Sequence, residues 1–165
     1  MIKLNRTTEY GLIALRHMSR KKSEMKSQEA DAVTSAREIS DFYELPFEIT
    51  AKTLQRLKDT GIIQSAQGAR GGYTLQKCLS EVTLSEFLDG MEGPQCIVEC
   101  TGAPDSTGSQ CEYHGKCEIK GMMNSLNQRL VKFLNGISLS QVTEGATLVE
   151  LTSFTTTKKN QESVL

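Results

Sequence analysis

The chain has 165 residues, of which 38% are hydrophobic and 24% are charged, a composition typical of a soluble globular protein. No run approaches the roughly 18 apolar residues that a membrane span needs. The first residues lack the apolar core of a signal peptide, so we expect a cytoplasmic protein with no membrane contact. Trp is absent and there are only five Phe and four Tyr residues, which argues against a large aromatic-lined substrate pocket.

The net charge of −1 conceals two halves of opposite sign. Residues 1–77 carry 13 Lys or Arg against 9 Asp or Glu, whereas residues 78–165 carry 6 against 11. A basic half joined to an acidic half is a hint that the first half meets a polyanion. Chance clustering of charges on solvated faces would give the same count, so charge alone decides nothing.

The first predicted elements are helices. Apolar residues recur at three- and four-residue steps over residues 6–20, which predicts a helix. Residues 21–33 are polar and without periodicity, and they predict a connection. Ser35 and Glu38 have the spacing of a capping box, which predicts the start of a short helix that carries Ile39.

A further helix is expected over residues 46–60, ended by Gly61 as a left-handed cap. We expect its inner face to carry Ile49, Thr53, Leu54 and Leu57. Two short extended runs at 62–66 and 73–75 flank a glycine-rich turn, which predicts a β-hairpin. This order of helices and hairpin is the plan of a winged helix-turn-helix, here expected over residues 1–80. In that fold the helix before the hairpin enters the DNA major groove and the hairpin reaches the backbone or the minor groove.

Several side chains of this domain are candidate DNA contacts. Those near the start of the third helix are placed to reach base edges, and Arg56 is placed for a phosphate. Arg70 lies between glycines at the tip of the hairpin, where an arginine suits phosphates or a narrow minor groove. The alternative for each is an ordinary solvated side chain. The candidates are Thr8, Glu48, Thr50, Ala51, Lys52, Arg56 and Arg70.

The second half, over residues 81–145, combines a loop with a long helix. Thr83 and Glu86 predict another capped helix, which ends at the glycines that precede the segment 94–117. That segment is rich in Pro, Gly, Ser, Thr and Asp, so it is expected to be a loop. A helix over residues 118–137 presents an apolar stripe of Met122, Leu126, Leu130, Phe133, Leu134 and Ile137.

Pairing with the same helix of a second subunit would bury this stripe, so we expect a homodimer. The alternative is a core helix within one chain. The tail over residues 146–165 is expected to be disordered. The fold class is therefore mainly α with a small β-hairpin wing: a winged helix-turn-helix plus a long dimerisation helix.

Four of the five cysteines fall within 22 residues. In a reducing cytoplasm such a cluster favours metal binding or a redox switch over structural disulfides. The four are Cys96, Cys100, Cys111 and Cys117. The fifth, Cys78, follows the hairpin and is expected to be a small buried residue.

Several motifs together resemble the Rrf-two family of bacterial winged helix-turn-helix transcriptional regulators. They are the run Thr8-Glu-Tyr-Gly-Leu12, the run Thr53-Leu-Gln-Arg-Leu-Lys-Asp-Thr-Gly-Ile-Ile63, the hairpin Gly68-Ala-Arg-Gly-Gly-Tyr73, and the cysteine cluster that leads into Leu130-Val-Lys-Phe-Leu-Asn-Gly-Ile137. The resemblance covers residues 1 to about 145.

The resemblance implies a homodimer that binds a near-palindromic double-stranded DNA operator. It also implies an iron–sulfur cluster, of the 2Fe–2S or 4Fe–4S type, held by Cys100, Cys111 and Cys117. Glu9, Cys96 and His114 are the candidates for the fourth ligand. An aerobically prepared sample could lack the cluster.

The expected function is that of a DNA-binding transcriptional regulator, most simply a repressor. It would sense redox state, nitric oxide or iron through the cluster. The alternative is a DNA-binding regulator that uses zinc or a reversible thiol switch. An enzyme is not expected, because a cysteine nucleophile needs a base and neither of the two histidines lies in an obvious pocket-forming motif.

Overall fold

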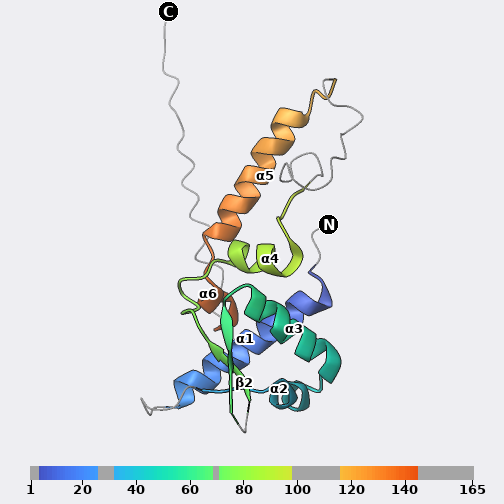
Figure 1. The fold of residues 1–165 in the computed structure, drawn as a ribbon. Coiled ribbons are helices and arrows are strands. Elements are labelled where there is room, and N and C mark those ends of the chain that lie inside the picture. The colour runs from blue at the N-terminus through green and yellow to red at the C-terminus, as the bar shows by residue number, and fades with distance from the viewer. Residues whose placement is uncertain (1–3, 26–31, 69–70, 98–115, 145–165) are drawn as a thin grey trace, which may run out of the picture.

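The computed structural model describes residues 4–25, 32–68, 71–97 and 116–144 (Figure 1). These residues form six helices and one two-stranded hairpin, which confirms the expected fold class. The elements are α1 (Arg6–Glu24), α2 (Ala36–Tyr43), α3 (Phe47–Asp59), β1 (Ile63–Ala66), β2 (Gly72–Leu75), α4 (Leu84–Glu92), α5 (Lys120–Asn135) and α6 (Leu139–Thr143).

Three helices begin where a hydroxyl group caps them. The side chains of Ser35, Thr83 and Ser138 each accept a hydrogen bond from the backbone N–H three residues later. This contact satisfies one of the N–H groups that a helix start leaves without a partner. The predicted helix starts at Ser35 and Thr83 are thereby confirmed, and Gly61 follows α3 with a φ of +72°, as a left-handed cap requires.

The first helix is longer than expected. It continues to Glu24, so residues 21–24 belong to α1 and not to the polar connection. Lys21 explains this extension, because its ammonium group reaches the carbonyl of Val33 at 2.7 Å and the carboxylate of Glu38 on α2. A tertiary contact therefore holds a turn of helix that periodicity alone did not predict.

The hairpin is antiparallel, with Ile63 opposite Leu75 and Ala66 opposite Gly72. Thr34, on the segment before α2, forms a bridge with Tyr73 through two backbone hydrogen bonds of 2.9 Å. This approach requires a glycine next to Tyr73, because a Cβ atom at Gly72 would lie 2.7 Å from the carbonyl oxygen of Thr34. The end of β2 that follows the turn is thus fixed to the segment before α2.

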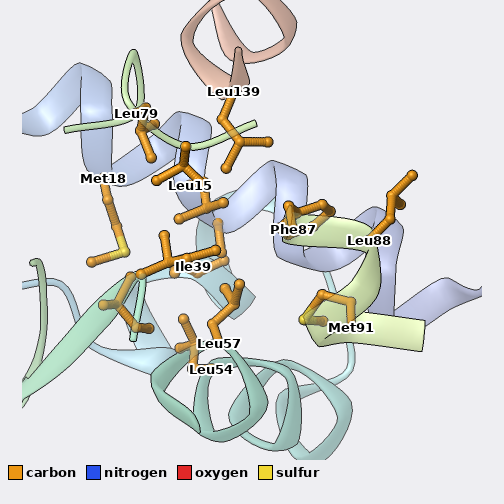
Figure 2. Close-up of a cluster of buried hydrophobic side chains, with 14 residues drawn as sticks. Leu15, Met18, Ile39, Leu54, Leu57, Leu79, Phe87, Leu88, Met91 and Leu139 are labelled. Carbon is orange, nitrogen blue, oxygen red and sulfur yellow. The ribbon is translucent and has the colours of Figure 1, made fainter. Parts of the chain in front are cut away.

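A single apolar cluster lies between α1, α2, α3, α4 and α6 (Figure 2). Figure 2 shows Leu15 and Met18 of α1 above Leu54 and Leu57 of α3, with Phe87 and Met91 of α4 at one side. These six side chains are at most 1% exposed. The core fixes α3 against α1, so the outer face of α3 is held in one orientation.

The fifth helix extends away from this body (Figure 1). Its base is joined to the body by backbone pairing, in which Leu84 N–H donates to Ile137 O and Leu139 N–H donates to Val82 O. Ser140 N–H adds a third hydrogen bond, to Leu79 O. No residue of α5 is buried. Among the helices of the described ranges, none combines the length and the apolar character needed to cross a bilayer.

The apolar stripe of α5 is largely exposed in the single chain. Met122, Leu126 and Phe133 are 60%, 47% and 42% exposed, and Ile137 beyond the end of the helix is buried. The described part of the chain therefore leaves the stripe uncovered at Met122, Leu126 and Phe133. The expected division into residues 1–80 and 81–145 stays a prediction, and the tail over 146–165 lies outside the described residues.

Candidate functional site

The third helix has one buried and one exposed face. Thr50, Thr53, Leu54 and Leu57 are buried, a spacing of three, one and three residues that places them on one side. The opposite side carries Glu48, Lys52, Gln55, Arg56, Lys58 and Asp59, all exposed, with Ala51 partly exposed. The exposure expected for Glu48, Lys52 and Arg56 is confirmed. The helix before the hairpin thus presents to solvent a polar face that has three cations against two carboxylates.

Two expectations for α3 were wrong. Thr50 was expected on the exposed face, but it is 1% exposed and its hydroxyl donates to the carbonyl oxygen of Pro46 at 3.0 Å. Ile49 was expected on the inner face, but it is 40% exposed. The helix is rotated relative to the prediction because a buried threonine can satisfy its hydroxyl on the carbonyl four residues earlier. Thr50 therefore supports the helix and is not available to a ligand.

Thr8 also lies elsewhere than expected. It is fully buried, and both its N–H and its hydroxyl donate to Asn5 Oδ1, at 2.8 and 3.0 Å. Asn5 is the N-cap of α1, and its own N–H donates to Glu92 Oε1 at 2.9 Å. The N–H and the hydroxyl of Thr8 therefore cap and seat α1 and are not free for a phosphate. Sequence reasoning placed the helix start correctly and missed its cap.

Two exposed aromatic rings, Phe47 on α3 and Phe42 on α2, each lie against an arginine. The guanidinium of Arg37 on α2 lies 4.3 Å from the ring centroid of Phe47, and that of Arg20 on α1 lies 4.8 Å from the centroid of Phe42. Both distances are within the range of a cation–π interaction. The contact at Phe47 holds a positive charge beside the first turn of α3. Sequence reasoning missed both pairs.

A polar network beside Phe42 joins α1 to α2. Glu38 accepts hydrogen bonds of 2.6 and 2.8 Å from Lys21 and lies 3.1 Å from Nε2 of the buried His17. Partial burial acts to raise the pKa of Glu38, but the hydrogen bonds from Lys21 and His17 outweigh it and hold that pKa below its usual value. Glu38, which the sequence predicts as part of a capping box, therefore ties α2 to α1.

The turn between α2 and α3 sets the angle of the pair. Glu44 ends α2 in the left-handed region with a φ of 53°. The Ser40 hydroxyl donates to Leu45 O at 2.7 Å, and the Leu45 N–H donates to Ser40 O at 2.9 Å. A short turn closed in this way is typical of a helix-turn-helix. Arg70, at the expected tip of the hairpin, lies outside the described residues.

The cysteine segment is described only at its two ends. Cys96 is exposed and Cys117 is partly buried, and both are free thiols. Cys100, Cys111 and His114 lie outside the described residues, so the expected ligand set is not tested. Within the described ranges, no three His, Cys, Asp or Glu side chains come together as a metal site would need.

The start of this segment is anchored on both sides of Cys96. Gln95 N–H donates to Asp89 Oδ1 of α4 at 3.2 Å, and Ile97 N–H donates to Asn127 Oδ1 of α5 at 3.0 Å. The chain at Cys96 is thereby tied to α4 and to α5 at once. Sequence reasoning identified neither Asp89 nor Asn127, and the partner of Asn127 is 30 residues away.

Two further candidates are placed by the structure. Glu9 is partly exposed and accepts a hydrogen bond of 2.9 Å from the exposed Arg6, an ion pair of the weak surface kind. Cys78 was expected to be buried, and this is wrong: it is exposed and lies 3.0 Å from the Ser80 hydroxyl. That hydrogen bond lowers the pKa of the Cys78 thiol.

A helix-turn-helix, followed by an antiparallel hairpin and with a basic outer face on its second helix, defines a winged-helix DNA-binding protein. The family model of Rrf2, described as "Iron-dependent Transcriptional regulator", matches residues 4–145. The chain belongs to this family, which confirms the resemblance.

Curated relatives match over most of the chain. The HTH-type transcriptional repressor NsrR of Streptomyces coelicolor is 22% identical over 142 residues, which cover 86% of this chain and 90% of NsrR. The HTH-type transcriptional regulator IscR of Klebsiella pneumoniae is 24% identical over 114 residues, which cover 69% of this chain and 67% of IscR. The relatives are transcriptional regulators, in line with the expectation that the chain is not an enzyme.

Solved structures share the fold. CymR, the global cysteine regulator of B. subtilis, has a TM-score of 0.62 at 19% identity, over 88% of this chain and 98% of CymR. The IscR of T. potens has a TM-score of 0.58 at 17% identity, over 90% of this chain and 91% of that protein. At these identities the likeness supports the fold alone.

Proposed function

We propose that this transcriptional regulator is a cytoplasmic homodimer that represses genes by binding a near-palindromic operator. It senses redox state, nitric oxide or iron through an iron–sulfur cluster. The observation that carries the DNA-binding part is the outer face of α3, which exposes Lys52 and Arg56 while the opposite face is locked into the core. A rigid helix with an exposed basic face next to a hairpin is the arrangement that enters a major groove.

The side chains of this face divide by position. Glu48, Ala51 and Lys52 lie in the first turns of α3 and meet base edges, where a carboxylate accepts from cytosine and an ammonium donates to guanine. Arg56 lies one turn later and binds phosphate, and Arg70 does the same from the wing. Such phosphate contacts release counterions, so operator affinity falls steeply with salt.

The homodimer is supported by the exposed stripe on α5. Met122, Leu126 and Phe133 leave apolar area in water that a second copy of the helix would cover. A twofold axis that relates the two paired α5 helices would set the two α3 helices of the dimer at one fixed spacing, as a palindromic operator requires.

The donor set of the cysteine segment fits an iron–sulfur cluster, because thiolates are the ligands that such clusters take. Cys100, Cys111 and Cys117 would hold it, with Glu9, Cys96 or His114 as the fourth ligand. The described thiols of Cys96 and Cys117 are free, and a bound cluster would supply reactivity toward oxygen and nitric oxide.

Contacts within the chain would transmit a change in the cysteine segment to the DNA-binding domain. Asp89 and Asn127 hold the segment around Cys96 against α4 and α5. A change in the segment therefore acts on the angle between α5 and the body, and so on the spacing of the two α3 helices. The description of the family as iron-dependent supports this reading.

A zinc site or a reversible disulfide is the second candidate. The observation that favours it is that Cys96 is solvent-exposed, so that an oxidant or a zinc ion can reach its thiol. Both candidates keep the same DNA-binding face and differ only in what the cysteines hold.

The experiment is an anaerobic purification followed by an absorption spectrum and a count of iron, sulfide and zinc. Affinity for a duplex selected from a random pool is then measured before and after exposure to air or nitric oxide. A coloured protein whose affinity changes supports the proposal, and a colourless zinc protein supports the second candidate.

Variants make the test specific. Cys111→Ser should lose both colour and response, whereas Cys78→Ser, which changes an exposed thiol outside the segment, should keep both. Equal affinity with and without the cluster would refute the sensing step. A protein that selects no sequence from the pool would refute DNA reading altogether.

A further inference from the structure

Ile49 is an exposed apolar side chain at the edge of the polar face of α3. Ile49 is 40% exposed, although its neighbour Thr50 is buried in its place. Leaving a branched apolar side chain in water while burying a threonine forgoes hydrophobic stabilisation. The exposure therefore has no benefit for the isolated chain.

The surroundings of Ile49 indicate what covers it. Lys52 and Arg56 follow at three and seven residues, so both flank Ile49 on the same side of the helix. An apolar side chain flanked by these two cations is complementary to a polyanion that offers an apolar group inside its charged surface.

The DNA major groove has this combination. Its edges are lined by phosphates, and within it only thymine presents a methyl group, at C5. Branched aliphatic side chains recognise that methyl by contact, without a hydrogen bond. The two cations beside Ile49, Lys52 and Arg56, match the phosphates of such a partner.

We infer that Ile49 is a specificity-determining residue that contacts the C5 methyl group of a thymine in the operator. The inference rests on the proposed DNA-binding function and names a feature of the sequence that the protein reads. Lys52 then reads or anchors the neighbouring position, and Arg56 holds a phosphate.

The test uses the full-length protein and the duplex that it selects from a random pool. Each selected dT is replaced in turn by deoxyuridine, which lacks only the methyl group. Loss of one buried methyl group corresponds to about a fourfold loss of affinity. We expect wild-type protein to bind one dU duplex about fourfold more weakly than the parent duplex.

Ile49→Ala should bind the dT and dU duplexes equally, each about as weakly as wild type binds dU. Ile49→Val keeps a branched side chain and should retain the discrimination. Lys58→Ala is the matched control, because Lys58 is an exposed cation of the same helix and should weaken both duplexes alike. Thermal unfolding should show that Ile49→Ala stays folded, since the side chain is outside the core.

The outcomes separate this inference from the proposed function. If the protein selects a duplex but no dU substitution matters, or if Ile49→Ala discriminates as wild type does, the inference is overturned and DNA reading stands. If a protein partner covered Ile49 instead, the result would be the same lack of a methyl effect. If no duplex is selected, both are overturned.

Discussion

Replacing Glu38 by Gln removes the carboxylate that joins α1 to α2 and keeps the shape of the side chain. Hydrogen bonds to charged groups contribute about 1.5–3 kcal/mol, whereas exposed ion pairs contribute about 0.2–1 kcal/mol. The Lys21 and Glu38 side chains are 28% and 35% exposed, between these two cases. We therefore expect Glu38→Gln to lower the free energy of unfolding by about 1–2 kcal/mol near neutral pH.

The loss of stability in Glu38→Gln should become smaller as the pH falls. Because the pKa of Glu38 is lower in the folded than in the unfolded chain, its carboxylate stabilises the fold above the unfolded-state pKa. This stabilisation disappears as the pH falls through the folded-state pKa. Gln does not titrate, so wild type and Glu38→Gln should differ most near neutral pH and converge in acid.

Urea denaturation of both proteins at neutral pH and at about pH 3.5 measures this difference. Glu86→Gln is the control, because the Lys77–Glu86 pair is close to half exposed on both sides and should change stability by less than about 0.5 kcal/mol. Equal stability of Glu38→Gln and wild type near neutral pH would refute the reasoning, and so would a difference that persists unchanged in acid.

Two further changes test other parts of the structure. Leu126→Glu places a charge in the exposed stripe of α5 and should weaken self-association at least tenfold in sedimentation equilibrium. Gln128→Glu, on the opposite side of α5, is the control and should leave self-association unchanged. A monomeric wild type would contradict this prediction. Thr50→Val removes one hydrogen bond to Pro46 and should lower the free energy of unfolding by about 0.5–1 kcal/mol in chemical denaturation. The operator affinity should stay within twofold of wild type. A larger loss of affinity would mean that Thr50 faces DNA.

Helix starts were predictable from the sequence because a cap is a local contact. Ser35 and Thr83 each bind a backbone N–H only three residues away, so their spacing to the following residues carries the information. Gly61 is similar, since its positive φ depends on its own missing Cβ. The hairpin followed from the same kind of local signal.

The rotation of α3 was not predictable from hydrophobicity. Ile49 is the more apolar residue, yet Thr50 completes the spacing of the buried face with Thr53 and Leu57. Packing against α1 and α2 decides which residue turns inward, and a threonine tolerates burial because its hydroxyl finds a helix carbonyl. Sequence reasoning therefore predicted the helix correctly but placed Ile49 and Thr50 on the wrong faces of it.

The contacts that position the candidate site could not be predicted from the sequence, for a different reason. Lys21 and Glu38 are 17 residues apart, and Ile97 and Asn127 are 30 apart, so no local pattern reveals them. The cysteines themselves were visible as a cluster. Their roles stay predictions, because Cys100 and Cys111 lie outside the described residues.

The backbone pairing at the base of α5 has a mechanical consequence. At about 1.5 Å per residue, the 16 residues of α5 form a rod about 24 Å long, clamped at one end by Val82 and Leu84. A tilt of about 10° at the clamp displaces the far end by about 4 Å. The helix is thus a lever arm, and a small rearrangement near its far end becomes a whole-body rotation of the part of the protein that faces DNA.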